Sequence, residues 1–295
     1  MLIYLVDLIC KTSFALKKYI LLCICLLSHC LFAQNCFSKS LKDTPGVVSF
    51  TFRNEFSKDV PGTLDFIKEM GIRNIEFSNL FGKTAAEMRA LLDARGMVCT
   101  SYGVYYDALT NKTEEVIQNA KTLGAEFVRV GMIPHKGEFT VQQAAVAVKD
   151  FNRVGQKLKE NGIEFSYHNH GYDFTPYQNE TMYDYLIQQT NPAYVSFELD
   201  ILWVHQFGQD PLAYLKKYPN RFRLMHVKDL KKGIPVGLDV KTSSENDVPL
   251  GTGQIAVHKI LKQARKSAIK YYYLEDENSN SRAQVPLSLA FLKNL

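Results

Sequence analysis

Residues 69–72 (EMGI) end an amphipathic segment of helical length and begin an apolar run. The same arrangement, a glycine between a helix-like segment and a strand-like run, returns three times before residue 164. The further copies are residues 94–97 (ARGM), 122–125 (TLGA) and 160–163 (ENGI). A glycine that ends a helix and is followed at once by a strand is typical of repeated strand–helix units. The repeat therefore predicts an α/β protein.

Eight runs rich in β-branched and aromatic residues are spread over the chain from Val47 onward. We expect strands near residues 47–52, 73–77, 97–103, 126–131, 163–168, 194–200, 222–228 and 270–275. Eight strand–helix units in about 250 residues predict a single (β/α)8 TIM barrel over residues 46–295. An open doubly wound sheet would carry a glycine-rich turn after its first strand, and residues 53–56 (RNEF) contain no glycine. We interpret the segment 231–253, which contains proline and glycine, as a βα loop over the barrel mouth.

The beginning of the chain has the features of an export signal. An apolar run over residues 19–32 follows Lys17 and Lys18 and is short for a membrane span. We expect residues 1–33 to be a signal peptide and residues 34–45 a polar leader, so that the protein is exported to the periplasm or secreted. An uncleaved membrane anchor and a lipid anchor are the alternatives.

The composition is that of a globular protein, with 46% hydrophobic and 22% charged residues among 295. The chain has 35 basic and 30 acidic residues, and no clustered stripe of Lys and Arg. Binding to the phosphate backbone of nucleic acids needs such a stripe. We therefore expect no nucleic-acid partner.

Four consecutive predicted strands end on side chains that can bind metal ions. These ends are residues 166–170 (SYHNH), 197–200 (FELD), 224–229 (LMHVKD) and 273–277 (YLEDE). Because the carboxyl ends of barrel strands meet at one face, His168, Asp200, His226 and Glu275 can converge there. Two imidazoles and two carboxylates suit one divalent ion of Mn, Fe, Co or Zn. The alternative is a buried salt-bridge network in which Lys228 neutralises the carboxylates.

Other polar and aromatic residues at strand ends are candidates for the same face. Glu76 can act as an acid or base there, or can bind only a neighbouring turn. Trp203 and Tyr102 can stack on a sugar ring, although core packing is the commoner role of such aromatics. We expect Arg129 and Asn169 to bind substrate.

A set of short segments resembles a known superfamily. The segments are 167–170 (YHNH), Asp200 with 208–211 (GQDP), 226–229 (HVKD), 251–253 (GTG) and 275–277 (EDE). In these, the chain from Val47 to its end is similar to the xylose isomerase-like barrels, which include sugar isomerases, epimerases, inosose dehydratases and endonuclease IV. The resemblance implies that Asp200, His226 and Glu275 are metal ligands.

The resemblance breaks at the fifth strand, where the epimerases commonly carry a glutamate that binds metal and transfers protons. This chain has His168 at that position. The departure argues against two-base epimerisation through that pair of carboxylates. The strand end is closer to the dehydratase-like members and to those that cleave keto-sugars.

These residues predict proton removal beside a sugar carbonyl, since a bound divalent metal would acidify that C–H bond. We expect Glu198 or His170 to be the base, Lys228 to stabilise the enediolate, and Glu76 or Glu275 to return a proton.

Several outcomes are compatible with this chemistry. The principal expectation is a carbohydrate isomerase or epimerase. A lyase, a dehydratase or an enzyme that cleaves 3-keto-glycosides would use the same enediolate chemistry. A non-catalytic barrel that binds sugar is the second alternative, and a homodimer is compatible with all three. Because sugar phosphates are cytoplasmic metabolites, export points to a substrate without phosphate.

Overall fold

The four glycine joints end helices in the left-handed conformation, with φ of 86° at Gly71, 63° at Gly96, 73° at Gly124 and 77° at Gly162. This conformation is accessible to glycine at little cost, which explains the repeat. The computed structural model describes residues 45–238, 240 and 242–295. Within these residues, each joint leads into a strand of one sheet.

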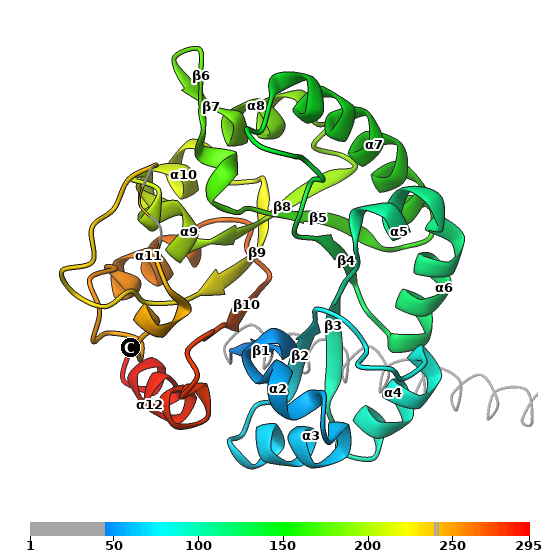
Figure 1. Ribbon diagram of the computed structural model, residues 1–295. Helices are drawn as coiled ribbons and strands as arrows, with labels where there is room; N and C mark the ends of the chain where they lie inside the picture. The colour runs from blue at the N-terminus through cyan, green and yellow to red at the C-terminus, as the bar shows by residue number, and fades with distance from the viewer. Residues whose placement is uncertain (1–44, 239, 241) are drawn as a thin grey trace, which may run out of the picture. The chain divides into compact units, whose positions relative to one another are not determined.

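The eight parallel strands close into a barrel, as predicted (Figure 1). They are β1 (Gly46–Val48), β2 (Asn74–Phe77), β3 (Val98–Gly103), β4 (Phe127–Val130), β5 (Glu164–His168), β8 (Val195–Asp200), β9 (Phe222–Val227) and β10 (Tyr271–Leu274). Their order around the barrel is β1-β10-β9-β8-β5-β4-β3-β2. The four strands whose ends carry the candidate metal ligands are therefore direct neighbours.

Helices surround the barrel (Figure 1). They are α2 (Arg53–Phe56), α3 (Val60–Glu69), α4 (Ala85–Asp93), α5 (Tyr106–Asn111), α6 (Thr113–Leu123), α7 (Val141–Glu160), α8 (Met182–Gln189), α9 (Ile201–Gln206), α10 (Pro211–Lys217), α11 (Val257–Ala264) and α12 (Ser281–Lys293). Thr84, Thr140 and Thr181 begin α4, α7 and α8 with capping boxes. Each threonine side chain accepts a backbone N–H that the first helical turn leaves unpaired.

Three features differ from the expectation or extend it. The first strand ends at Val48, and residues 49–52 form the 3-10 helix η1 (Ser49–Phe52). The chain turns there because the Ser49 hydroxyl accepts the backbone N–H of Ser78, which follows β2, at 2.9 Å. A short antiparallel hairpin, β6 (Pro176–Tyr177) and β7 (Glu180–Thr181), lies outside the barrel sheet. Two further 3-10 helices are η2 (Gly171–Phe174) and η3 (Ser244–Asn246).

The expected signal peptide and nearly all of the polar leader lie outside the described residues. Among the described helices, none has both the length and the apolar character that crossing a membrane requires.

Candidate active site

Neighbouring strands deliver two of the expected metal ligands in register. Asp200 at the end of β8 pairs with His226 on β9. His168, the last residue of β5, pairs with Glu198, which is two residues before Asp200 and faces the same way. The barrel geometry therefore gathers two imidazoles and two carboxylates at the carboxyl ends of three adjacent strands.

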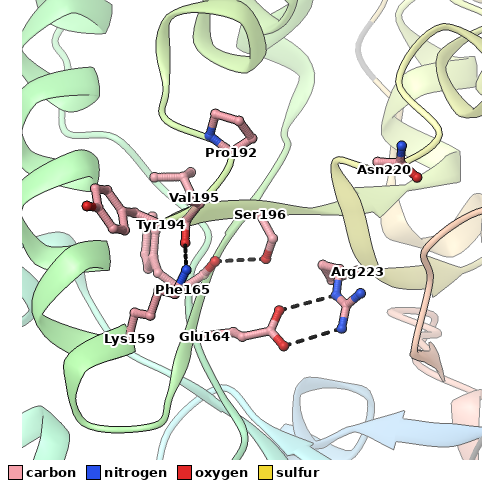
Figure 2. A pocket seen from close by; sticks show the side chains of 10 residues that line it. Lys159, Glu164, Phe165, Pro192, Tyr194, Val195, Ser196, Asn220 and Arg223 are labelled. Atoms are coloured by element: carbon pink, nitrogen blue, oxygen red, sulfur yellow. Dashed lines mark hydrogen bonds and ion pairs between the residues drawn. The ribbon is translucent and has the colours of Figure 1, made fainter.

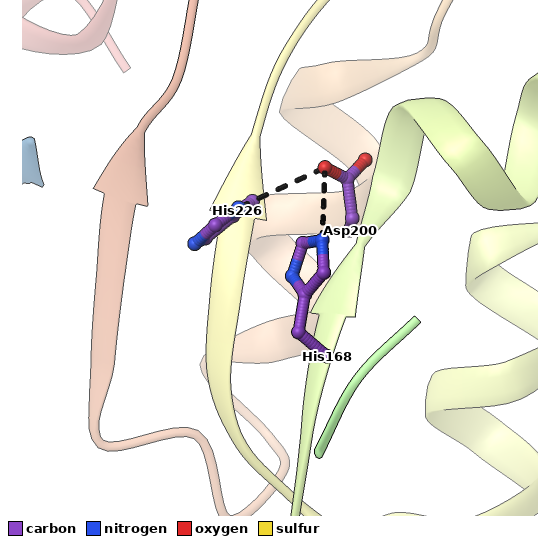
Figure 3. A group of neighbouring side chains, drawn as sticks. All are labelled: His168, Asp200 and His226. Atoms are coloured by element: carbon purple, nitrogen blue, oxygen red, sulfur yellow. Dashed lines mark ion pairs between the residues drawn. The ribbon is translucent and has the colours of Figure 1, made fainter. Parts of the chain in front are cut away.

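The side chains of His168, Asp200 and His226 point toward one another (Figure 3). Asp200 Oδ2 lies 3.7 Å from His226 Nδ1 and 4.0 Å from His168 Nε2. Glu275 Oε2 lies 3.0 Å from the same His226 Nδ1. All four predicted ligands are thus close together, and all four are at least nine-tenths buried.

The two oxygens of Asp200 have different surroundings. Oδ1 accepts the backbone N–H groups of Leu202 and Trp203, at 2.8 and 3.0 Å, and so caps the first turn of α9. Oδ2 is buried and has no hydrogen-bond partner within residues 45–238, 240 and 242–295. A buried carboxylate oxygen without a partner is costly unless something compensates it.

A divalent metal would supply that compensation. Ligand atoms bound at about 2.1 Å in a tetrahedron are roughly 3.4 Å apart. The spacings of Asp200 Oδ2 from the two imidazole nitrogens are close to that value. The mixed nitrogen and oxygen donors also suit a divalent ion such as zinc or manganese. The residues present therefore fit the predicted metal.

Glu76 and Glu198 lie beneath the imidazoles, in the barrel interior, and both are fully buried. His226 Nε2 is 2.9 Å from Glu76 Oε1 and 3.2 Å from Glu198 Oε2. Glu198 Oε2 is also 3.2 Å from His168 Nδ1. These carboxylates face the ring nitrogens that point away from Asp200, and such contacts orient imidazole ligands.

Arg129 on β4 balances part of this buried charge. It donates two hydrogen bonds to Glu76 Oε1, at 2.7 and 3.0 Å, and lies 3.4 Å from Glu198. Burial opposes ionisation of Glu76, but Arg129 and His226 outweigh it and lower its pKa to about 2. Burial and the charge of Glu76 raise the pKa of Glu198 to about 7. One carboxylate of the pair is therefore firmly ionised, and the other holds its proton more readily.

Lys228 is buried among carboxylates rather than exposed to the pocket. Its Nζ lies 2.5 Å from Glu277 Oε1, 3.3 Å from Glu275, 3.7 Å from Asp247 and 3.9 Å from Asp200. Burial disfavours the charged amine, but these carboxylates outweigh it and hold the pKa of Lys228 well above its ordinary value. Lys228 therefore carries a permanent positive charge at one side of the candidate metal ligands. It neutralises part of the carboxylate charge there, as in the salt-bridge network considered as an alternative from the sequence.

A pocket of about 300 Å³ opens above the cluster. Its lining includes His168, His226, Glu275, His170, Trp203 and Arg129. Burial lowers the pKa of His170 to about 4, so this imidazole is neutral at pH 7. In the described part of the chain, its Nδ1 has no hydrogen-bond partner. The ring centroid of His170 is 5.5 Å from that of Trp203. The pocket therefore offers a neutral imidazole and an indole face beside the candidate ligands.

Six predicted site residues do not line this pocket: Glu76, Glu198, Lys228, Tyr102, Asn169 and Asp200. The two glutamates face the barrel interior from positions that precede the last residue of their strands. They therefore lie too deep to contact a substrate in the pocket directly. Tyr102 points outward to Asn119 of α6, since its neighbours Ser101 and Gly103 occupy the inward positions of β3.

Asn169 also has a different place from the one expected. It is fully buried and does not line the pocket. Its Oδ1 accepts the backbone N–H of Asp200 at 3.0 Å, and its Nδ2 donates to the Asp200 carbonyl at 3.3 Å. Asn169 therefore holds the backbone of a candidate ligand instead of facing the substrate.

The role of Asp229 and of the loop that it holds was not evident from the sequence. The Asp229 carboxylate accepts the backbone N–H groups of Gly251 and Gly253, at 2.9 and 3.0 Å, and that of Ile255 at 3.0 Å. A Cβ at residue 253 would lie 2.2 Å from the Asp229 carboxylate, so glycine is required there. The segments 226–229 (HVKD) and 251–253 (GTG) can be recognised in the sequence, but the contact between them cannot.

A second pocket, of about 370 Å³, opens at the amino ends of β5, β8 and β9, at the opposite end of these strands (Figure 2). Glu164 and Arg223 face each other across it as an ion pair, with 3.2 Å between Arg223 Nε and Glu164 Oε2. None of the predicted site residues lines it. Its main charges satisfy each other, and it holds no cluster of candidate ligands.

Known proteins resemble the chain in sequence and in fold. The inosose dehydratase of Clostridium tetani is 25% identical over 186 residues, which cover 56% of this chain and 61% of that protein. Inosose dehydratase 1 of Bacillus cereus is 29% identical over 119 residues, 40% of this chain and 38% of that protein. The chain thus spans less than two thirds of both relatives.

Solved structures share the fold at lower identity. A sugar phosphate isomerase/epimerase from Parabacteroides distasonis has a TM-score of 0.71 and 21% identity, and covers 85% of this chain and 96% of its own. The IolI protein with a bound zinc atom has a TM-score of 0.67 and 12% identity, over the same 85% and 96%. The family model for the xylose isomerase-like TIM barrel matches residues 64–295. Because this match covers most of the chain, the protein belongs to the xylose isomerase-like TIM barrel family.

Proposed function

We propose that the protein is a divalent-metal enzyme that removes the proton beside a carbohydrate carbonyl and expels a group from the next carbon. The observation that carries the proposal is the buried Oδ2 of Asp200, which has no hydrogen-bond partner among the described residues and lies between two imidazoles that line the pocket. His168, Asp200, His226 and Glu275 would hold the metal. When bound, the metal would polarise the carbonyl and so acidify the neighbouring C–H bond.

His170 is the proposed base. It lines the pocket, its Nδ1 lacks a partner, and burial keeps the imidazole neutral at pH 7. A neutral imidazole can accept a proton from a carbon acid and later donate it to a leaving hydroxyl. Glu198 and Glu76 would instead act as positioning residues that orient the two imidazole ligands from below.

Elimination is the outcome that the proposal favours. Histidine, rather than a second carboxylate, ends β5, so a symmetrical pair of carboxylates does not flank the pocket. The curated relatives named inosose dehydratase support this choice. A bound zinc atom in the structural neighbour IolI supports the metal.

Isomerisation or epimerisation is a second candidate because of Glu277. This residue also lines the pocket, and its side chain is 23% exposed. A carboxylate there could return a proton to the carbon skeleton instead of letting a leaving group depart. We further propose a carbohydrate substrate without phosphate and export directed by residues 1–33.

The test combines metal dependence with isotope exchange. The purified chain, with Mn²⁺ or with excess EDTA, is incubated in D₂O with an inosose, with free ketoses and with aldoses, and the products are followed by NMR. We expect metal-dependent loss of water from the inosose. Deuterium uptake with interconversion of sugars would instead support the isomerase candidate. Turnover that persists unchanged in EDTA would contradict the proposal.

Replacing the base separates catalysis from metal binding. His170→Asn should lower turnover at least about a hundredfold, the usual range for loss of a general base, while metal content stays the same. His258→Asn makes the same substitution at an exposed position on α11 and should leave both unchanged. Full turnover in His170→Asn would remove His170 from the mechanism.

A further inference from the structure

A large groove lies beside the candidate active-site pocket. Its volume is about 900 Å³, three times that of the pocket. Aromatic rings form much of its surface, namely those of Phe139, Tyr172, Trp203 and Phe207. The pocket itself is at the lower end of the range for small-molecule sites, which is about 300–1,000 Å³. A single sugar ring in the pocket would leave the groove unfilled.

The groove and the pocket share one wall. Trp203 lines both of them. On the same wall, the ring of His170, which lines the pocket, is parallel to that of Tyr172, which lines the groove, with 6.2 Å between centroids and 2° between planes. The groove therefore lies directly next to the pocket, on the other side of Trp203 and of the His170 and Tyr172 rings.

The groove is built around rings that are held in place. Tyr172 OH accepts the backbone N–H of Ile133 at 2.9 Å, and the Phe139 ring packs on Tyr172 edge to face with 5.0 Å between centroids. The Phe207 ring fills the space above Gly171, where a Cβ would lie 2.0 Å from it. Fixed aromatic faces of this kind bind rings with an apolar face.

One buried polar side chain that lines the groove has an atom without a partner in the part of the chain that the structure describes. Gln206, the last residue of α9, is fully buried and lines the groove. Its Nε2 donates to the carbonyls of Pro235 and Val240, at 3.3 and 3.4 Å, which sets the orientation of the amide. Among the described residues, its Oε1 has no hydrogen-bond partner. A buried acceptor without a donor points to a ligand hydroxyl in the groove.

We propose that the groove is a second subsite for a hydroxylated ring linked to the sugar that reacts at the metal ligands. Its rings would stack on the apolar face of that group, and Gln206 Oε1 would accept one of its hydroxyls. The inference rests on the proposed function for the reacting half, and it makes the substrate a glycoside or similar two-ring compound. The second ring can be phenolic or a second sugar, and these two sources share the chemistry of an apolar face and an O–H donor.

The test measures binding in the groove without any catalysis. Trp203 is the single tryptophan of the chain, so intrinsic fluorescence reports on the shared wall directly. The full chain, in excess EDTA, is titrated with 4-fluorophenol, 4-fluoroanisole and D-glucose, while ¹⁹F NMR follows the first two ligands. Because no metal or turnover is needed, the result is independent of whether the proposed reaction is right.

We expect 4-fluorophenol to bind saturably. The affinity for 4-fluoroanisole, which cannot donate a hydrogen bond to Gln206, should be lower by roughly fivefold to tenfold. Binding by D-glucose instead would identify the second ring as a sugar. Phe207→Leu should lower the affinity for the ligand that binds by at least about fivefold. Leu287→Ala, at a 59% exposed position of α12, is the matched surface control and should have no effect.

Two results would overturn the proposal. One is that neither the phenol nor the sugar binds saturably. The other is binding that Phe207→Leu does not weaken while the variant unfolds at the wild-type temperature. The comparison of fluorophenol with fluoroanisole needs no variant, so equal affinity for the two would by itself exclude the role of Gln206 in phenol binding.

Discussion

The two oxygens of Asp200 have different roles: one stabilises a helix and the other is free to bind the proposed metal. One oxygen caps α9, and the other faces the imidazoles without a hydrogen bond. The backbone of the same residue is held on both sides by the Asn169 amide. The direction of the free oxygen is therefore set before any ion binds, which is the usual task of groups that support metal ligands.

Asn169→Ala should destabilise the fold and weaken metal binding at the proposed site. The buried N–H and carbonyl of Asp200 would lose their partners, which costs about 1–3 kcal/mol for such groups. We expect lower stability in urea denaturation and at least about tenfold weaker Mn²⁺ binding by calorimetry. Asn220→Ala, at an exposed position, is the control. Unchanged Mn²⁺ affinity in Asn169→Ala would show that Asp200 keeps its direction without the amide.

Asp173 predicts a pH dependence of stability. Burial raises the pKa of this carboxyl to about 8, although the backbone N–H of His170 and the Tyr167 hydroxyl, which donate to it, oppose the rise. The ordinary pKa of an aspartate side chain, 3.8, applies to the unfolded chain. Between these two pH values the folded protein keeps a proton that the unfolded chain has lost, so this residue lowers stability as the pH rises.

Asp173→Asn should remove that contribution, because the amide keeps a polar group in place and does not ionise. Its stability relative to wild type should increase from pH 4 to pH 8, by at most about 1.4 kcal/mol per pH unit, and then level off. Urea denaturation of both proteins at several pH values measures this difference. A difference that stays constant with pH would mean that Asp173 is ionised in the folded protein.

At the scale of elements, the loop 231–253 depends on one carboxylate. Asp229 follows β9 and accepts backbone N–H groups from the end of this loop. A bridge between Leu230 and Asp247 joins the start of the loop to its later part. Asp247 in turn accepts the backbone N–H of Glu277 and lies beside Lys228. The loop is therefore coupled to the charged side of the candidate active site.

Gly253→Ala should disrupt this coupling. The added Cβ would lie 2.2 Å from the Asp229 carboxylate and 2.4 Å from the Leu230 carbonyl, and the latter is backbone and cannot move aside easily. We expect a loss of about 1–3 kcal/mol in stability, which is typical of such overpacking, and faster proteolysis in the loop. Lys232→Ala, exposed in the same loop, should behave as wild type. Wild-type stability of Gly253→Ala would show that Asp229 does not anchor the loop.

For the whole barrel, the uneven charge at the carboxyl ends of its strands predicts stabilisation by metal. Asp200, Glu275, Glu277 and Asp247 surround Lys228, which carries one positive charge among four carboxylates. A divalent ion that binds the folded state alone adds RT ln(1 + [L]/Kd), or about 2.7 kcal/mol at a hundred times Kd. Melting in Mn²⁺ should therefore occur at a higher temperature than in EDTA.

The Asp200→Asn variant provides the specificity control for this metal effect. It keeps an oxygen that can cap α9 but removes the charge that faces the imidazoles. Its melting temperature should change little between Mn²⁺ and EDTA. An equal Mn²⁺ effect in both proteins would place the ion elsewhere on the molecule.

Local patterns predicted much of this fold. Eight apolar runs separated by helices, with glycine at the joints, are properties of neighbouring residues, and all eight strands were found close to their expected positions. The first strand was predicted too long, because the turn at Ser49 depends on a bond to Ser78, which is distant in the chain. The meeting of His168, Asp200, His226 and Glu275 was also predictable, since parallel strands place their carboxyl ends together.

Depth and direction within the barrel were decided by the tertiary structure. Tyr102 and Asn169 stand beside strand ends in the sequence, yet the first faces α6 and the second binds the Asp200 backbone. Glu198 and Glu76 meet under the imidazoles because β2 and β8 approach across the barrel, which no spacing along the chain reveals. The sequence alone determined the eight-stranded barrel and the metal-binding residue types, because these follow from local periodicity. Only packing between distant segments decided which of those residues face the pocket and which hold the others in place.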